Sequence, residues 1–185
     1  MALGGLIAFR TLDVPDLTAD GSFPLGGAVA GISIIAGVNP WLACAFGMLA
    51  GSVAGIVTAW LHVKLGILQL LASILVMVAL YSVNLRIMGA PNLPLLGETT
   101  VFSTLVSDGN GYWMRCLIIG VVVLLAMLFL NWFYSTETGL SMRATGSNLR
   151  MAQAQGINTS WMTIIGMAIS NGLIALAGAL FVQTQ

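Results

Sequence analysis

The stretch from Trp113 to Tyr134, WMRCLIIGVVVLLAMLFLNWFY, decides the fold class. A membrane-spanning helix needs roughly 20 mostly apolar residues, and this run reaches that length with Arg115 as its one charged residue. Its apolar residues are continuous, whereas a strand of a membrane barrel alternates apolar and polar residues over about ten positions. We therefore expect a helix that crosses a membrane.

Further apolar runs precede and follow this one. Those that approach or reach a spanning length are Pro24–Val38, Trp41–Leu61, Gly66–Val83 and Trp161–Val182. Ala2–Phe9 is apolar but too short to span, so we expect it to be the end of a helix. The runs predict an all-α fold: a polytopic transmembrane helical bundle of about five spanning helices plus a partial first helix, in one domain over residues 1–185.

The composition supports the same class of protein. Hydrophobic residues make up 58% of the chain and charged residues only 6%, whereas soluble domains carry about 25% charged residues. This excludes a cytosolic enzyme, a nucleic-acid binder and a disordered tail. The two cysteines, Cys44 and Cys116, lie in apolar runs and do not indicate a disulfide scaffold.

The few basic residues indicate an orientation. Cytoplasmic loops are enriched in Lys and Arg, and the basic segments contain Arg10, Lys64, Arg143 and Arg150. The segment 91–112 carries Glu98 and Asp108 but no Lys or Arg. We therefore expect residues 10–23, 62–64 and 135–160 on the cytoplasmic side and 91–112 outside, although Arg86 and Arg115 count against this orientation.

Glycines recur at helical spacing in two of the runs. Gly47, Gly51 and Gly55 form overlapping G-x-x-x-G steps, and Gly27 and Gly31 form another. Small residues allow the close backbone approach that favours helix association in lipid. We expect these faces to be packing contacts, with a moving interface as the alternative.

The sequence offers no set of groups for catalysis. His62 is the only histidine, and no Asp or Glu falls inside the apolar runs. There is no H-E-x-x-H zinc motif and no G-x-x-x-x-G-K-[ST] nucleotide loop. We therefore expect no enzyme activity, cofactor or metal, and no acidic group near the middle of the membrane to couple ions to transport.

Neutral polar residues do occur inside the runs. Those singled out as a candidate lining of a translocation path are Ser73, Asn84, Ser170 and Asn171. A buried amide or hydroxyl in lipid needs hydrogen-bond partners. The same residues can therefore be explained by hydrogen bonds between helices, and both interpretations stay open.

A polar segment, LDVPDLTADGSFP, separates the first two apolar stretches. Its notable residues are Asp13, Pro15, Asp16, Asp20, Gly21, Ser22 and Pro24. We expect the prolines to break helices, and Ser22 or Asp20 to cap a helix that starts near Pro24. A structured turn with a helix cap would explain the segment without a further role.

The segment 135–160 is polar and longer than a simple connection. Residues 148–155 fit a short helix, and Gly156 is a suitable C-terminal stop. Such a segment is either a docking element or an inert positive loop.

This loop resembles the cytoplasmic coupling loop of ABC importer permeases that serve branched-chain amino acids, ribose and related solutes. The resemblance rests on Gly139, Arg143, Ala144, Thr145, Gly146, Asn148, Met151, Ala152, Gly156 and Ile157. The segment 12–26 is similar to the subgroup of tryptophan/tyrosine and unassigned ABC uptake permeases. The resemblance covers essentially the whole chain. Such permeases begin with a complete first helix and continue past residue 182 with further spanning helices, so we expect a piece of a longer permease that is truncated at both ends.

The resemblance implies a transport subunit in the bacterial inner membrane. Its implied partners are the lipid bilayer, a cytoplasmic ATPase that docks on residues 135–160, a periplasmic or lipoprotein solute-binding protein, and a second permease subunit, expected to form a homodimer. An amino acid is the expected solute, and no nucleic acid is involved. The alternative function is a passive channel or a secondary carrier for a small solute.

Overall fold

The computed structural model describes residues 1–89, 101 and 111–184. The elements within them are helical: α1 (Ala2–Leu6), the π-helical turn η1 (Ile7–Thr11), α2 (Thr18–Ile35), α3 (Pro40–Leu65), α4 (Gln69–Met88), α6 (Gly111–Tyr134), α7 (Glu137–Ser147), α8 (Leu149–Ala154) and α9 (Thr159–Val182). The predicted all-α bundle is confirmed for this part of the chain.

Four of the described helices are long and apolar enough to cross a membrane. They are α3, α4, the Arg115–Tyr134 part of α6, and α9. The fifth expected span, residues 24–38, lies in α2, which has 18 residues and begins with the polar sequence TADGS. Ala2–Thr11 is a shorter apolar helix, as its length predicts.

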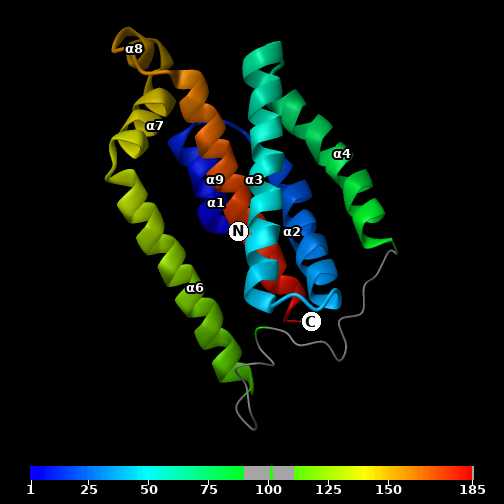
Figure 1. The fold of residues 1–185 in the computed structure, drawn as a ribbon. Coiled ribbons are helices and arrows are strands. Elements are labelled where there is room, and N and C mark those ends of the chain that lie inside the picture. The colour runs from blue at the N-terminus through cyan, green and yellow to red at the C-terminus, as the bar shows by residue number, and fades with distance from the viewer. Residues whose placement is uncertain (90–100, 102–110, 185) are drawn as a thin grey trace.

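Helix α9 lies in the middle of the bundle. It packs against α3, α2 and α1, while α4 lies on the outer side of α2 and α6 stands to one side (Figure 1). The Gly47/Gly51/Gly55 face of α3 points at α9 and α2: a Cβ on Gly51 would lie 2.6 Å from the Asn171 carbonyl oxygen, and one on Gly47 would lie 2.9 Å from that of Gly26. The predicted packing role of this glycine face is confirmed.

The expected start of the second helix is wrong. Helix α2 begins at Thr18 and continues through Pro24, and its N-terminus has no side-chain cap from Asp20 or Ser22. Pro24 removes one backbone hydrogen bond from the helix interior. Close contacts with α9 before and after Pro24 hold the helix together despite this loss. Gly26 abuts the Ala175 backbone, and Gly178 abuts the Phe23 backbone.

The connections alternate between the two ends of the bundle (Figure 1). The α3–α4 turn, α7 and α8 lie at one end, and the α2–α3 turn and the start of α6 lie at the other. This is the alternation expected from the basic residues. The acidic segment 91–112, including Glu98 and Asp108, falls almost entirely outside the described residues.

Replacing Gly51 by Leu should disrupt the bundle, because the added side chain meets α9 backbone and Ala175. Overpacking of this kind costs about 3 kcal/mol. We expect a lower apparent melting temperature and aggregated material in size-exclusion chromatography. Gly120→Leu is the matched control, since nothing lies within 4 Å of a Cβ there. Equal behaviour of the two variants would contradict the packing of this face.

Single cysteines at Ser147 and Ala36 should label from opposite sides of the membrane. Both positions are exposed, at opposite ends of the bundle. In a Cys44→Ala/Cys116→Ala background, an impermeant thiol reagent applied from outside should modify Ala36→Cys and spare Ser147→Cys until the membrane is permeabilised. The reverse pattern would contradict the orientation.

Candidate functional site

Asn171, midway along α9, is the centre of a buried polar network. Its side chain is completely buried. The amide oxygen Oδ1 accepts a 2.8 Å hydrogen bond from the Ser22 hydroxyl, and Nδ2 donates to Asp16 Oδ2 at 2.7 Å and to the Met167 carbonyl at 3.2 Å. Both ends of the amide are therefore satisfied, as a buried amide requires.

Asp16 brings a carboxylate into the bundle interior. Only 3% of it is exposed, and its second oxygen accepts a 2.9 Å hydrogen bond from the Thr18 backbone N–H. We expected no acidic group near the middle of the membrane, yet Asp16 lies beside Asn171, midway along α9. Asp16 lies in the linker rather than in an apolar run, and the fold carries this linker inward to the midpoint of α9.

Two threonines that the sequence did not single out extend the network to α3. The hydroxyls of Thr18 and Thr58 lie 2.9 Å apart, and Thr58 also donates to the Ala54 carbonyl. The linker, α2, α3 and α9 are thereby joined by side-chain hydrogen bonds. The sequence shows only that Thr58 is a polar residue within an apolar helix. It does not indicate that Thr18 is its partner.

The four residues proposed to line a path do not converge on one site. Ser170 donates to the Gly4 carbonyl of α1 at 2.8 Å, and Ser73 donates to Leu70 within α4. Asn84 donates to the Gly21 carbonyl at 3.5 Å, and its buried oxygen has no partner among the described residues. Each contact is explained by helix packing, and a path-lining role stays a prediction.

The rest of the N-terminal motif has varied environments. Gly21 lies against α4, where a Cβ would be 3.2 Å from the Met77 Cα atom. Asp13 is exposed with a positive φ of 54°, a conformation that Asp tolerates better than most residues. The other three members are exposed: Pro15, Asp20 and Pro24.

The 135–160 loop contains two helices. The predicted one is α8, with Asn148 as its N-cap: the Asn148 side chain accepts from Met151 N–H at 3.1 Å. Gly156, at φ 82°, ends it, and the N–H groups of Gly156 and Ile157 bond to the carbonyls of Gln153 and Ala152. This is the Schellman arrangement that a glycine stop favours. The sequence analysis missed α7.

Helix α7 is fixed to the N-terminal segment and to α6. Gly146 lies against the Thr11 and Leu12 backbone, and Gly139 lies against the backbone of Phe133 and Tyr134. A side chain at either position would force these backbones apart.

Arg143 and Tyr134 complete this junction. The Arg143 guanidinium carbon lies 4.5 Å from the centre of the Tyr134 ring, a cation–π arrangement. The Tyr134 hydroxyl is 2.8 Å from the Thr11 hydroxyl. Arg143 therefore contacts the end of α6, while α8 carries the side chains that project outward from the loop.

The outward face of α8 is mixed in character. Leu149, Arg150 and Met151 are exposed, and Ala152 is buried against the rest of the loop. Ala144 and Ile157 are half-buried. An exposed pair of large apolar side chains beside an arginine is suited to contact with another protein.

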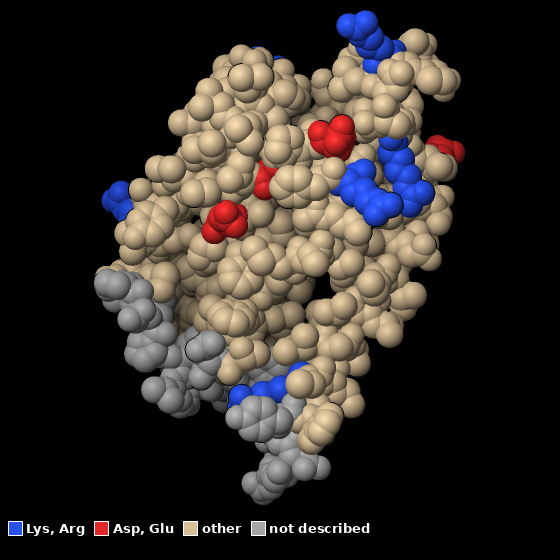
Figure 2. Space-filling view, turned by 180° about the vertical axis from the view of Figure 1, so that it is seen from behind, with Lys and Arg blue, Asp and Glu red and all other residues tan. Residues whose placement is uncertain are grey.

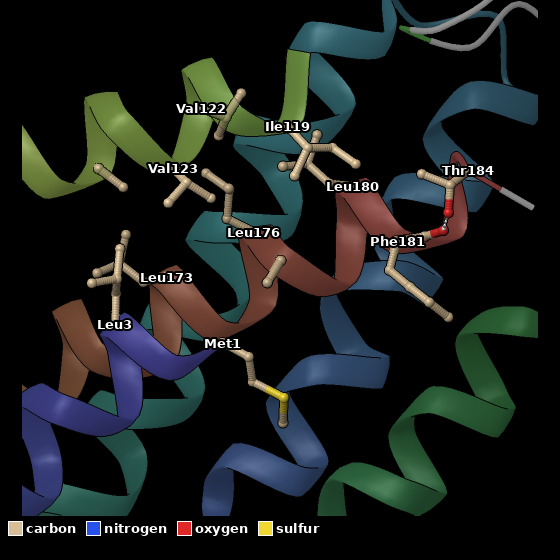
Figure 3. A pocket seen from close by; sticks show the side chains of 12 residues that line it. Met1, Leu3, Ile119, Val122, Val123, Leu173, Leu176, Leu180, Phe181 and Thr184 are labelled. Atoms are coloured by element: carbon tan, nitrogen blue, oxygen red, sulfur yellow. Dashed lines mark hydrogen bonds between the residues drawn. The ribbon is translucent and has the colours of Figure 1, made fainter. Parts of the chain in front are cut away.

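A separate cavity of about 280 Å³ lies between α6, α9 and the start of α1 (Figure 3). Its lining is apolar, with Leu3, Val122 and Leu176 facing one another across it, and Thr184 is its one polar side chain. Such a lining lacks the convergent polar groups that orient a polar ligand.

The whole chain, residues 1–185, matches the family model described as the branched-chain amino acid transport system / permease component. The chain belongs to this family, as the loop and the N-terminal motif predicted. The family consists of transport permeases, which are not enzymes, and the chain is a multi-pass membrane protein.

Individual relatives have the following similarities. A tyrosine transport system permease protein of Clostridioides difficile is 40% identical over 99% of this chain and 60% of its own length. An uncharacterized protein of Rickettsia prowazekii is 35% identical over 100% of this chain and 64% of its own. A probable branched-chain amino acid transport permease protein of Methanocaldococcus jannaschii is 25% identical over 97% and 60%. The chain thus spans less than two thirds of each relative. No solved structure matches the chain.

Replacing Asn171 by Leu should destabilise the bundle by about 3 kcal/mol, because it removes one hydrogen-bond partner from the buried Asp16 carboxylate and one from the Ser22 hydroxyl. We expect a clear fall in the apparent melting temperature of the solubilised protein. Ser73→Ala is the control, since it removes only a bond within α4 and should cost about 1 kcal/mol or less. Equal losses would contradict the special role of the network.

Proposed function

We propose that the chain belongs to the transmembrane subunit of a bacterial ABC importer and forms part of its solute path. Family membership over residues 1–185 and the spanning helices support this function. The energy would come from a separate ATPase, since the chain carries no nucleotide-binding loop. The expected solute is an amino acid, because the Clostridioides relative is a tyrosine transport system permease protein.

The observation that carries the proposal is the anchoring of the 135–160 loop. Helix α8 presents exposed Leu149 and Met151, while α7 is seated through Gly146 on the backbone of Thr11 and Leu12. The same linker continues to Asp16, which is bonded to Asn171 at the middle of α9. A force applied to α8 would therefore reach the bundle centre through packed backbone and a buried hydrogen bond.

The remaining partners follow from this role. An ATPase docks on the loop at the cytoplasmic end, and a periplasmic or lipoprotein binding protein delivers solute at the other end. A second permease subunit, in a homodimer, completes the path.

Gly146→Val and Arg143→Ala should reduce ATP-dependent uptake while membrane insertion is retained. The valine would collide with the Thr11 backbone, and the alanine removes the contact with Tyr134; both changes release α7. Arg150→Ala should reduce uptake much less, since its loss leaves α7 anchored and keeps the exposed Leu149 and Met151 of α8 for docking. The measurements are solute uptake by the complete transporter in proteoliposomes and co-purification of the ATPase.

Full uptake and full ATPase retention in both α7 variants would contradict the coupling role of the loop. Uptake that proceeds without ATP or any ATPase would instead indicate the passive channel or secondary carrier.

A further inference from the structure

A polar pocket of about 480 Å³ lies where η1, the end of α6 and α7 meet. The residues that line it include two arginines, Arg10 and Arg143, together with Asp13, Thr11 and Tyr134. Ligand sites in proteins occupy roughly 300–1000 Å³, so the pocket can hold a group larger than a single ion. It is separate from the Asp16–Asn171 network and from the outward face of α8.

The charges of the pocket favour a singly charged anion. Arg10 and Arg143 are both exposed, and neither forms a salt bridge within the described part of the chain. Two arginines and Asp13 give a net charge of one positive unit, which matches the single negative charge of a phosphodiester. Figure 2 shows basic side chains next to one another on this face, with acidic side chains close by.

The pocket walls are held in place without using the donors that an anion needs. The Tyr134 ring contacts the face of the Arg143 guanidinium, 4.5 Å from ring centre to guanidinium carbon. Stacking occupies the face of this planar group and leaves the N–H groups at its edge available. The Tyr134 hydroxyl is fixed by Thr11 at 2.8 Å, and Gly146 lets α7 approach the same segment.

The pocket lies at the depth where lipid headgroups are found. Tyr134 is the last residue of the spanning helix α6, and exposed Trp132 precedes it; aromatic residues at the ends of spans sit at the headgroup level. Only 11% of the α6 span is buried among the described helices, so its apolar side chains are suited to contact acyl chains.

We propose that this pocket binds the phosphate of an anionic phospholipid, such as phosphatidylglycerol, with its acyl chains along α6. Basic pockets between transmembrane helices bind anionic headgroups in this way. The two guanidinium edges donate to the phosphodiester oxygens, and Asp13 accepts from the glycerol hydroxyls. A headgroup with a quaternary ammonium, which has no N–H to donate and no net charge, fits less well.

The proposal is tested by native mass spectrometry of the purified protein in detergent, with phosphatidylglycerol or phosphatidylcholine added at equal concentrations. We expect retained phosphatidylglycerol and little phosphatidylcholine. Loss of each arginine should weaken phosphatidylglycerol binding about fivefold, so Arg10→Gln/Arg143→Gln loses most of it. Arg150→Gln, outside the pocket, should bind as the parent does.

Two further variants distinguish loss of the binding site from loss of the fold. The Arg10→Lys/Arg143→Lys variant keeps both charges and should retain most of the binding, which separates loss of the site from loss of the fold. If the double glutamine variant does not fold, Arg10→Gln alone decides, because Arg10 is exposed at the end of η1. Equal retention of the two lipids, or unchanged binding by the glutamine variants, would overturn the proposal.

A soluble phosphate ester could present the same phosphate group to this pocket. Glycerol 1-phosphate should fail to displace the lipid at equal concentration, since it lacks acyl chains to contact α6. Efficient displacement would show a site for soluble phosphate esters and overturn the lipid assignment. No ATPase is present in these measurements, so their outcome is independent of the proposed transport function.

Discussion

The hydrogen bond between Asp16 and Asn171 is the contact on which the arrangement of this bundle depends. The lipid core offers no water to a polar group, so each buried donor and acceptor must find a partner inside the protein. Asp16 meets this demand through Asn171 and the Thr18 N–H, and Asn171 meets it through Asp16, Ser22 and Met167. Because these groups come from the linker, α2 and α9, satisfying them fixes where the three segments meet.

Glycines of α3 allow close packing around this network. Gly51 and Gly55 of α3 bring that helix against α9 at Asn171 and Met167. The short interhelical distances leave no room for a Cβ on these glycines, and the apolar gain between helices in lipid is small. Polar bonds and glycine contacts therefore work together in holding α3, α2 and α9.

The linker that carries Asp16 also supports the 135–160 loop. Gly146 of α7 rests on Thr11 and Leu12, only a few residues before Asp16. One continuous stretch of chain thus contacts the loop at one end of the bundle and the middle of α9. In the proposed importer, this stretch would transmit movement of the loop to the helices of the path.

The sequence predicts those features that depend on local chemistry. The long spans α3, α4, α6 and α9 follow from their apolar length, and the ends of α8 follow from Asn148 and Gly156. The motifs of the loop and of the N-terminal segment also identify the family.

Features that depend on distant contacts were missed or mistaken. Asp16 looked like a loop residue, because nothing near it in the sequence indicates that its partner is Asn171. Pro24 looked like a helix breaker, but packing of Gly26 and Gly178 keeps α2 helical through it. The apolar positions reveal which residues face inward, yet they do not specify which buried polar groups will meet.

The most direct test of this central contact is an exchange of its two side chains, followed by thermal unfolding of the solubilised protein. Asn171→Asp alone places two carboxylates against each other, and Asp16→Asn alone removes the charged acceptor. The double variant restores a bond between an amide and a carboxylate. We predict that it recovers stability relative to the sum of the single losses, with a coupling free energy of about 1–3 kcal/mol. Additive losses in the double variant would contradict a direct Asp16–Asn171 bond at the centre of the bundle.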